Sequence, residues 1–392
     1  MKKLLSALLL AILFIFTSCS SEMPAPSPTP SAPEPSPTPL FEFDKTQKVN
    51  VIDCYGANGT DYIINFNLDR EIRVLQLADI QLIDVENARP TRYDQLYNTY
   101  FQSGVLSHYE RAWKYVDEAV LLGIPDLIVL TGDNVQGETD DDGSDWLELI
   151  EKLDSYNVPW LCVFGNHDNE SAMGVTWQCL QLSASKNCVF KSGNVSGNSN
   201  YSVLIAKNGE PQYMFYMLDS NGATQYPNNY GEGILPTNVD ISKIQQHLGV
   251  QQDQILWFYS SYLKASAKFG KIPSLMFFHI PPIQSNLEVD FNEGAYTVTD
   301  SAFGIYKEVI GGFDGSGLIS FAKNTNCKGM FYGHQHNVAV SSVYEGIRMT
   351  HGLKTSTHCY HDSEMLGSTL ILLKSQSDFQ VKYLFSQLKY NL

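Results

Sequence analysis

Five short apolar runs in this chain each lead directly into residues whose side chains can bind a metal ion. One of them is Leu127-Ile128-Val129-Leu130, which is followed by Thr131-Gly132-Asp133. The candidate ligands and their neighbours after the five runs are, in chain order, Asp79, Asp133, Asn166-His167-Asp168, His279 and His334-Gln335-His336. Open α/β sheets place their functional sites beyond the carboxyl ends of the strands, so we expect these side chains to converge.

The converging set is large enough to hold two metal ions. It combines carboxylate and amide oxygens with imidazole nitrogens, a mixture that divalent cations accept. Phosphate esters are among the slowest compounds to hydrolyse in water without a catalyst. Two cations roughly 3.5–4 Å apart can clamp the phosphoryl oxygens and supply a nucleophile. The sequence offers the ligand types that such a dinuclear site needs.

The motifs resemble, in order and spacing, those of the calcineurin-like metallophosphoesterases, from about residue 73 to residue 355. Within that family, the segments that look most like the non-purple branch of purple-acid-phosphatase relatives are Ala78-Asp79, Thr131-Gly132-Asp133-Asn134, Phe278-His279-Ile280-Pro281 and Gly352-Leu353-Lys354-Thr355. Purple enzymes have a Tyr where this chain has Gln136. The resemblance implies an α/β fold with two mixed β-sheets packed as a sandwich and flanked by helices.

The resemblance also implies how the ligands divide between two divalent metal ions. Asp79 and His336 would bind the first ion, and Asp133 would bridge both ions. The second ion would be bound by Asn166, His279 and His334. A hydroxide that bridges the two ions would attack phosphorus in line. His167 would orient the phosphate and protonate the leaving oxygen, and Asp168 would fix the orientation of the His167 ring.

One residue departs from the family pattern. The first motif of the family is Asp-x-His, and this chain has Asp79-Ile80-Gln81. Gln81 can still bind a metal ion through its amide oxygen, but a neutral amide is a weaker ligand than imidazole. We therefore expect the first site to be the weaker one. Mn²⁺, Mg²⁺ or Ca²⁺ would suit this oxygen-rich site better than Zn²⁺, and Fe²⁺ and Zn²⁺ remain further choices.

Two other classes of function remain open. If Gln81 marks the loss of the first metal ion, the protein is a non-catalytic lipoprotein that binds a metal ion or a phosphorylated ligand. The presence of His167 favours the enzyme, because a binding module has no evident need of it. A carbohydrate-binding surface lipoprotein would account for the aromatic content, but it leaves the ordered metal ligands unexplained.

The N-terminus has the pattern of a bacterial lipoprotein. Two lysines precede an apolar run over residues 4–16, which is too short to span a bilayer and is typical of a signal peptide. Phe16-Thr17-Ser18-Cys19 resembles a lipobox, which predicts a signal peptide over residues 1–18 and a lipid anchor on Cys19. Ordinary signal cleavage is the alternative. Residues 19–40 form the anchor and a proline-rich linker, so we expect a lipid-anchored, extracytoplasmic protein of the cell envelope.

Hydrophobic spacing predicts one catalytic domain over residues 41–392, without an internal repeat. Residues 41–70 alternate between apolar and polar side chains and predict an N-terminal β-hairpin. The segment 183–233 is expected to contain one strand, and 311–317 a glycine-rich loop. The other elements expected are helices over 107–122, 145–156 and 241–269, and strands over 212–218, 346–351, 368–373 and 379–385.

Charge restricts the partners. The formal net charge is −16, and it becomes −18 (24 minus 42) when the two lysines of residues 1–18 are removed. A chain this acidic is not expected to bind nucleic acid, but bound cations would still admit a small phosphorylated substrate. Specificity for that substrate is expected in residues 81–106 and 219–235. The residues expected at the surface or the substrate rim are His351, His358 and His361, and Cys179 and Cys188 are the best placed local disulfide pair.

Overall fold

The computed structural model describes residues 40–83, 108–137, 142–171, 173–222, 249–286, 297–298, 302–306, 312–376 and 378–388. The predicted signal peptide, Cys19 and all of the linker except residue 40 lie outside these residues. Most of the two predicted specificity segments also lies outside them. Within the described ranges, every helix is too short or too polar to cross a membrane.

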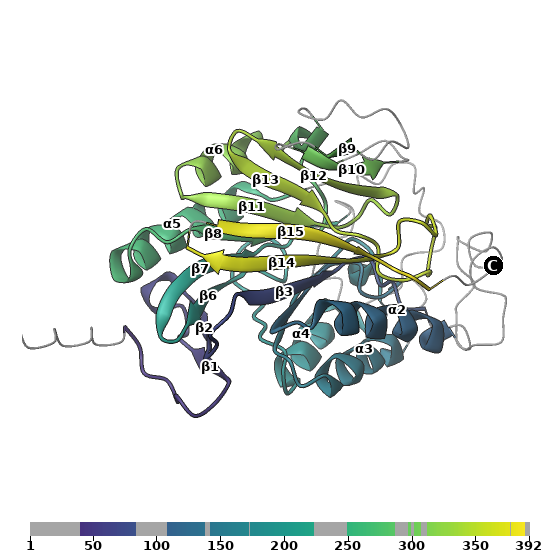
Figure 1. Ribbon diagram of the computed structural model, residues 1–392, viewed down its shortest axis with the longest axis horizontal. Coiled ribbons are helices and arrows are strands. Elements are labelled where there is room, and N and C mark those ends of the chain that lie inside the picture. Colours follow the sequence, from purple (N-terminus) through teal and green to yellow (C-terminus); the bar gives the residue numbers. More distant parts are fainter. Residues whose placement is uncertain are drawn as a thin grey trace, which may run out of the picture. The chain divides into compact units, whose positions relative to one another are not determined.

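Two mixed β-sheets form the framework of the domain (Figure 1). The smaller sheet has the strand order β15 (Asp378–Phe385), β14 (Gly367–Ser375), β3 (Ile72–Leu77), β4 (Leu127–Thr131) and β5 (Trp160–Val163). Its strands β3, β4 and β5 run parallel, and β14 and β15 extend it in antiparallel fashion. The three parallel strands are buried along nearly their whole length, as expected for strands covered on both faces.

The larger sheet has ten strands. Their order is β1 (Val49–Asp53), β2 (Tyr62–Phe66), β6 (Tyr201–Lys207), β7 (Glu210–Met217), β8 (Ser274–Phe277), β11 (Cys327–Tyr332), β13 (Ile347–His351), β12 (Val338–Tyr344), β10 (Ala302–Tyr306) and β9 (Thr297–Val298). β1 and β2 pair antiparallel, which gives the hairpin expected at residues 41–70. β7, β8, β11 and β13 run parallel in the centre of the sheet.

Side-chain alternation along the central strands divides the interior into two cores. Phe215, Phe277 and Phe331 belong to a core that also contains residues of the smaller sheet, and the rings of Phe277 and Phe331 stack with centroids 5.3 Å apart. The neighbouring residues Tyr216 and Met276 point to the opposite face, where they join a second core. The first core therefore joins the two sheets, and the second lies beneath helices on the outer face of the larger sheet.

Helices cover both sheets. Residues of α2 (His108–Gly123), α3 (Ser144–Ser155) and α4 (Gly174–Ala184) contribute to the core of the smaller sheet. Residues of α5 (Gln252–Phe269) and α6 (Ser316–Lys323) cover the larger sheet. The described residues also include three short 3₁₀ turns: η1 (Ala57–Gly59), η2 (Asp168–Glu170) and η4 (Ile283–Asn286). The predicted fold class, two mixed sheets flanked by helices, is confirmed.

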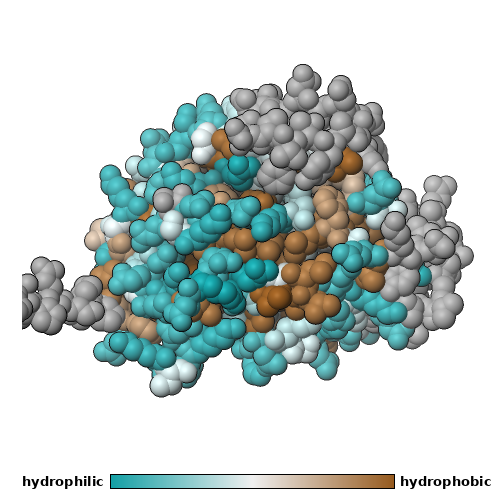
Figure 2. Space-filling model, viewed as in Figure 1, coloured by the Kyte–Doolittle hydropathy of each residue, from teal (hydrophilic) through white to brown (hydrophobic). Residues whose placement is uncertain are grey.

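Figure 2 shows apolar surface near the centre of the face that carries β14 and β15, surrounded by polar residues. β15 is an edge strand, and Phe379, Tyr383 and Phe385 on it are only partly buried.

The cysteine prediction is wrong. All six cysteines in the described residues are free thiols. The Sγ atom of Cys179 on α4 lies 3.7 Å from the carbonyl oxygen of Asn198. The main chain of Cys188 instead forms an isolated β-bridge with Trp160 at the start of β5. The histidine prediction also needs correction, because His351 and His358 are buried rather than at the surface.

Candidate functional site

The carboxyl ends of strands from both sheets meet at one place. The main-chain N–H of Asp79 donates to the carbonyl of Gly132 at 3.2 Å, which links the ends of β3 and β4. The Gln76 side chain on β3 donates to the carbonyl of Tyr332 at the end of β11, 3.1 Å away, and so joins the two sheets. Because these ends are fixed to one another, the side chains that follow them are held close together.

Glycines and left-handed residues allow this close approach. A Cβ atom at Gly333 would lie 2.5 Å from the Asp79 carboxylate, so no larger residue fits there without movement. Asp79, Asp133 and His334 have φ angles of 53°, 49° and 74°, in the region that side-chain-bearing residues seldom adopt. Strained backbone of this kind persists where the surrounding structure enforces it and clusters at functional sites.

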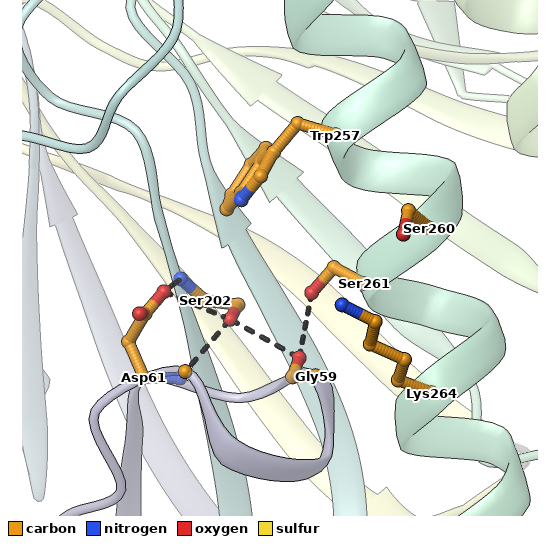
Figure 3. Close-up of a pocket in the computed structure, with 8 residues that line it drawn as sticks. Gly59, Asp61, Ser202, Trp257, Ser260, Ser261 and Lys264 are labelled. Carbon is orange, nitrogen blue, oxygen red and sulfur yellow. Dashed lines mark hydrogen bonds between the residues drawn. The ribbon is translucent and has the colours of Figure 1, made fainter.

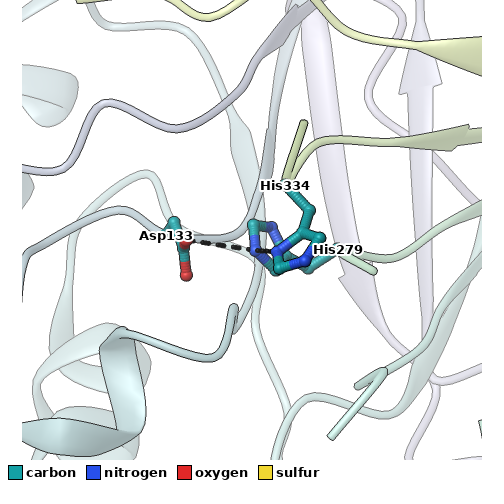
Figure 4. Close-up of side chains that lie close together, drawn as sticks. All are labelled: Asp133, His279 and His334. Carbon is teal, nitrogen blue, oxygen red and sulfur yellow. Dashed lines mark hydrogen bonds and ion pairs between the residues drawn. The ribbon is translucent and has the colours of Figure 1, made fainter. Parts of the chain in front are cut away.

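One group of ligands surrounds the carboxylate of Asp133 (Figure 4). Atoms of Asp133, His279 and His334 lie within 4.8 Å of one another, and Figure 4 shows the two rings beside the carboxylate. His279 Nε2 is 3.2 Å from Asp133 Oδ2, 3.3 Å from His334 Nδ1 and 3.1 Å from Asn166 Oδ1. Four predicted ligands of the second metal ion therefore converge on one point.

The chemistry of these atoms fits a cation. His279 Nδ1 donates to the carbonyl oxygen of Thr131 at 2.9 Å, so Nε2 is the ring nitrogen that faces the group. Asn166 Oδ1 and the Asp133 carboxylate offer lone pairs. Burial lowers the pKa of His279, but the charge of Asp133 outweighs it and raises that pKa to about 9, so without a metal ion Nε2 carries a second proton, which a bound cation would replace. Burial raises the pKa of Asp133, and the charge of His279 lowers it below its usual range.

A second group shares Asp133. Atoms of Asp79, Asp133 and His336 also lie within 4.8 Å of one another, and all three residues are buried. His336 Nε2 is 3.4 Å from Asp79 Oδ1, and His336 Nδ1 donates to the carbonyl oxygen of Tyr360 at 2.7 Å. The His336 ring also stacks on the Tyr360 ring, with centroids 4.1 Å apart. As at His279, a main-chain carbonyl leaves Nε2 as the atom available for a metal ion.

Gln81 lies beside this second group in an orientation that the sequence did not predict. Its amide oxygen accepts a hydrogen bond from Lys354 Nζ at 2.8 Å. Its amide nitrogen faces Asp133 Oδ2 and the side-chain oxygen of Gln136, each 3.4 Å away. The predicted metal-binding oxygen therefore points at a lysine.

Asp168 differs from the role predicted for it. The carboxylate of Asp168 accepts hydrogen bonds from the main-chain N–H groups of Asn134, Val135 and Gly165, at 2.8, 3.0 and 2.6 Å. It therefore fixes the loops after β4 and β5, and the prediction that it orients the ring of His167 is wrong. Burial and the charge of Asp133 raise the pKa of Asp168 to about 7, against the opposing effect of the main-chain donors.

Glu170 takes the predicted orienting position. Its Oε2 atom is 2.8 Å from His167 Nδ1, and Gln136 Nε2 is 3.2 Å from the same nitrogen. Because a carboxylate only accepts hydrogen bonds, His167 Nδ1 carries a proton. The main-chain N–H of His167 donates to Asp133 Oδ1 at 2.9 Å, so the ring is held next to the ligand groups.

Sequence reasoning missed the roles of Lys354 and Glu170. Lys354 lies 273 residues from Gln81, and spacing within a motif carries no information about such a contact. Glu170 is closer, three residues after His167, which caps the 3₁₀ turn that contains Glu170, and an acidic residue at that spacing could have been noted.

A small cavity of about 80 Å³ elsewhere in the domain is a weaker candidate (Figure 3). It lies between η1, β6 and α5, where the Trp257 and Lys264 side chains face Asp61 and Ser202. The Asp61 carboxylate already accepts hydrogen bonds from Ser202 and from Lys191, the latter at 2.5 Å. The convergent ligands at the strand ends therefore remain the candidate functional site.

Several known proteins are similar to this chain in sequence. In Arabidopsis thaliana, the proteins named "Probable inactive purple acid phosphatase 28" and "29" are 24% and 23% identical to the chain. The first match covers 60% of this chain and 59% of the relative, and the second covers 76% and 75%. Phosphatase DCR2 of Saccharomyces cerevisiae is 27% identical over 50% of this chain and 32% of its own. The chain thus spans less than two thirds of the length of some of these relatives.

Among solved structures, a dimetal phosphatase from Danio rerio matches 80% of this chain and 99% of its own at 12% identity, with a TM-score of 0.45. The sequence model of the calcineurin-like phosphoesterases matches residues 72–338, which contain both ligand groups. The chain therefore belongs to the calcineurin-like phosphoesterase family.

Proposed function

We propose that this protein hydrolyses a small phosphate ester, either a phosphomonoester or a phosphodiester, with two divalent metal ions. The observation that carries the proposal is the convergence of lone pairs around Asp133, where His279 Nε2 lies 3.1 to 3.3 Å from three further ligand atoms. A buried group of carboxylate, amide oxygen and imidazole nitrogens is unfavourable unless a positive charge, either a proton or a metal ion, lies among them. A buried dinuclear site explains this arrangement.

The ligands divide between two sites. Asp79, Asp133 and His336 form what we call the first metal site. The second metal site consists of Asp133, Asn166, His279 and His334. When bound, the two ions would polarise the phosphoryl oxygens and make a water molecule nucleophilic at neutral pH.

His167 is the residue that we place beside the leaving group. Its side chain is 16% exposed, so substrate can reach it, and Asp133 holds its main chain next to the ligands. With Nδ1 bound to Glu170, Nε2 is the nitrogen left to transfer a proton to the leaving oxygen. Glu170 thus acts as a positioning residue that fixes the imidazole tautomer.

We also propose that the protein acts outside the cytoplasm, anchored to the cell-envelope membrane through a lipid on Cys19. The support is the sequence alone: the lysines and apolar run of residues 1–18, followed by the proline-rich linker. A tethered esterase would meet small phosphorylated substrates, whose charge the two cations would offset.

A non-catalytic metal- or phospholigand-binding lipoprotein is the second candidate. It is favoured by the contact between Gln81 and Lys354, which takes a predicted ligand oxygen away from the first site. Two of the relatives are also named as inactive phosphatases.

Hydrolysis of a chromogenic phosphomonoester and the matching diester, by the full-length protein with added Mn²⁺, tests the proposal. We expect turnover of at least one substrate and its loss in Asn166→Ala, because Asn166 Oδ1 faces the second site. Asn324→Ala is the matched control, since Asn324 is exposed at the end of α6. If neither substrate is hydrolysed although Mn²⁺ binds, the non-catalytic candidate is correct.

A further inference from the structure

A lysine side chain is buried beside the first metal site. Lys354 is 1% exposed, and its main chain lies next to Ala78, one residue before Asp79. Its Nζ atom donates to the main-chain carbonyl of Asp79 at 2.7 Å and to Gln81 Oε1 at 2.8 Å. The ammonium group of Lys354 is thus buried beside a site that is expected to bind another positive charge, a metal ion.

This contact determines which way the Gln81 amide points. Lysine Nζ can only donate, so the amide atom 2.8 Å from it must be the oxygen. The amide nitrogen then faces Asp133 Oδ2, and it has no lone pair to offer a metal ion. Rotating the amide to present its oxygen to the site would put its N–H₂ group against the lysine, donor to donor.

The first metal site is weakened in two ways as a result. Among the described residues, it keeps three candidate protein ligands, Asp79, Asp133 and His336, whereas the second site has four. A metal ion there would also be repelled by the nearby ammonium group, and in a buried site such repulsion is poorly screened.

We propose that Lys354 withdraws Gln81 from metal binding and makes the first site a weak, separately filled metal site. The protein then holds one divalent ion tightly in the second site and fills the first only at higher metal concentration. Gln81 is a donor to the bridging carboxylate of Asp133 and not a ligand. This inference rests on the proposed two-metal function.

Titration of the metal-free, full-length protein with Mn²⁺ alone tests the proposal, with free Mn²⁺ measured by electron paramagnetic resonance. We expect two classes of site whose dissociation constants differ by about tenfold or more. Loss of a true ligand typically costs at least about 10- to 100-fold in affinity. In Gln81→Ala we instead expect the Mn²⁺ dissociation constant of the weaker site to change by less than about threefold. A loss of tenfold or more would overturn the proposal.

Lys354→Met should make the weaker site bind Mn²⁺ more tightly. Without the ammonium group, the Gln81 oxygen is free to turn toward the site, so we expect the weaker site to bind Mn²⁺ about tenfold more tightly. Lys374→Met, at an exposed lysine on β14, is the control. Unchanged or weaker binding in folded Lys354→Met would contradict the proposal. If that variant does not fold, Gln81→Ala decides alone.

These titrations need no turnover. If Mn²⁺ binds as expected but no ester is hydrolysed, the proposed function fails and the assignment of Lys354 stands. If esters are hydrolysed but the two sites bind Mn²⁺ equally, the assignment fails and the function stands.

Discussion

Single hydrogen bonds decide which atom of each site residue is available for chemistry. The Nδ1 atoms of His279 and His336 both donate to main-chain carbonyls, which leaves Nε2 for a metal ion. His167 differs, because its Nδ1 atom is paired with the carboxylate of Glu170. A carboxylate partner fixes the tautomer of an imidazole and makes the ring more basic than a carbonyl does.

Glu170→Ala should slow the cleavage of substrates with poor leaving groups. If Glu170 positions His167 as a proton donor, the rate with phenyl phosphate falls by about 10- to 100-fold, because that leaving oxygen needs a proton. The rate with 2,4-dinitrophenyl phosphate, whose leaving group needs no proton, falls by less than about threefold. Glu170→Gln keeps an acceptor for Nδ1–H and should recover part of the loss.

Steady-state kcat values for the two esters measure this difference. Glu210→Ala, at an exposed position on β7, is the control. Equal losses with both esters would mean that Glu170 supports the structure of the site and not proton transfer.

The elements of the fold were predictable where hydrophobic spacing is regular. The helix predicted over 145–156 is Ser144–Ser155, and the strand predicted over 379–385 is Asp378–Phe385. The strand Tyr201–Lys207 was missed, because it lies in a segment rich in Asn, Ser and Gly and is buried on both faces, without alternation. Helix α6 was partly assigned to a glycine-rich loop, since Gly315 and Gly317 flank its start.

The convergence of the candidate ligands was predictable from the sequence, and the hydrogen-bond partners of those residues were not. Strand ends followed by Asp, Asn or His are local patterns, and the family fixes their order. Contacts such as that of Lys354 with Gln81 depend on how distant segments pack, which spacing does not encode.

Asp168→Asn should destabilise the protein, because the Asp168 carboxylate ties together the ends of β4 and β5 through three main-chain N–H groups. An amide nitrogen in place of one carboxylate oxygen would face these donors and leave at least one unsatisfied. We expect the free energy of unfolding in urea to fall by about 3 kcal/mol. Asp378→Asn, at an exposed strand end, is the control, and an equal change in both variants would contradict this role.

His351 on β13 should make stability depend on pH. Burial lowers the pKa of His351 to about 3, whereas in the unfolded chain it is about 6.5. Between these values the unfolded state binds a proton that the folded state does not, so stability falls as pH decreases below about 6.5. From pH 7 to pH 5, His351 should account for about 2 kcal/mol of lost unfolding free energy.

Urea unfolding of wild type and His351→Met at several pH values measures this contribution. The difference in unfolding free energy between the two proteins should be constant above pH 7. As the pH falls below 7, the variant should lose less unfolding free energy than the wild type. A constant difference down to pH 5 would show that His351 is not held neutral.

The whole molecule brings ligands from both sheets to one edge. Asp79, Asp133 and Asn166 follow strands of the smaller sheet, and His279 and His334 follow strands of the larger one. The aromatic core shared by the sheets, with Phe277 and Phe331 stacked at its centre, fixes this alignment. Metal binding should therefore stabilise the complete domain and not one element.

Mn²⁺ should raise the melting temperature of the full-length protein. Binding to the folded state alone adds about 2.7 kcal/mol at a metal concentration 100 times the dissociation constant. Differential scanning calorimetry with and without Mn²⁺ measures the shift, which should be much smaller in Asn166→Ala and unchanged in Asn324→Ala. Equal shifts of the melting temperature in all three proteins would mean that Mn²⁺ does not bind beside Asn166.

The most direct test of the account is the location of the metal ions in a crystal of the protein grown with Mn²⁺. Anomalous scattering should give two peaks on either side of the Asp133 carboxylate, one beside Asp79 and His336 and one beside His279 and His334. At low Mn²⁺ concentration, the peak beside Asp79 should be the weaker. Crystals with bound Mn²⁺ but no peak at Asp133 would contradict the central claim that this residue lies at the centre of a metal site.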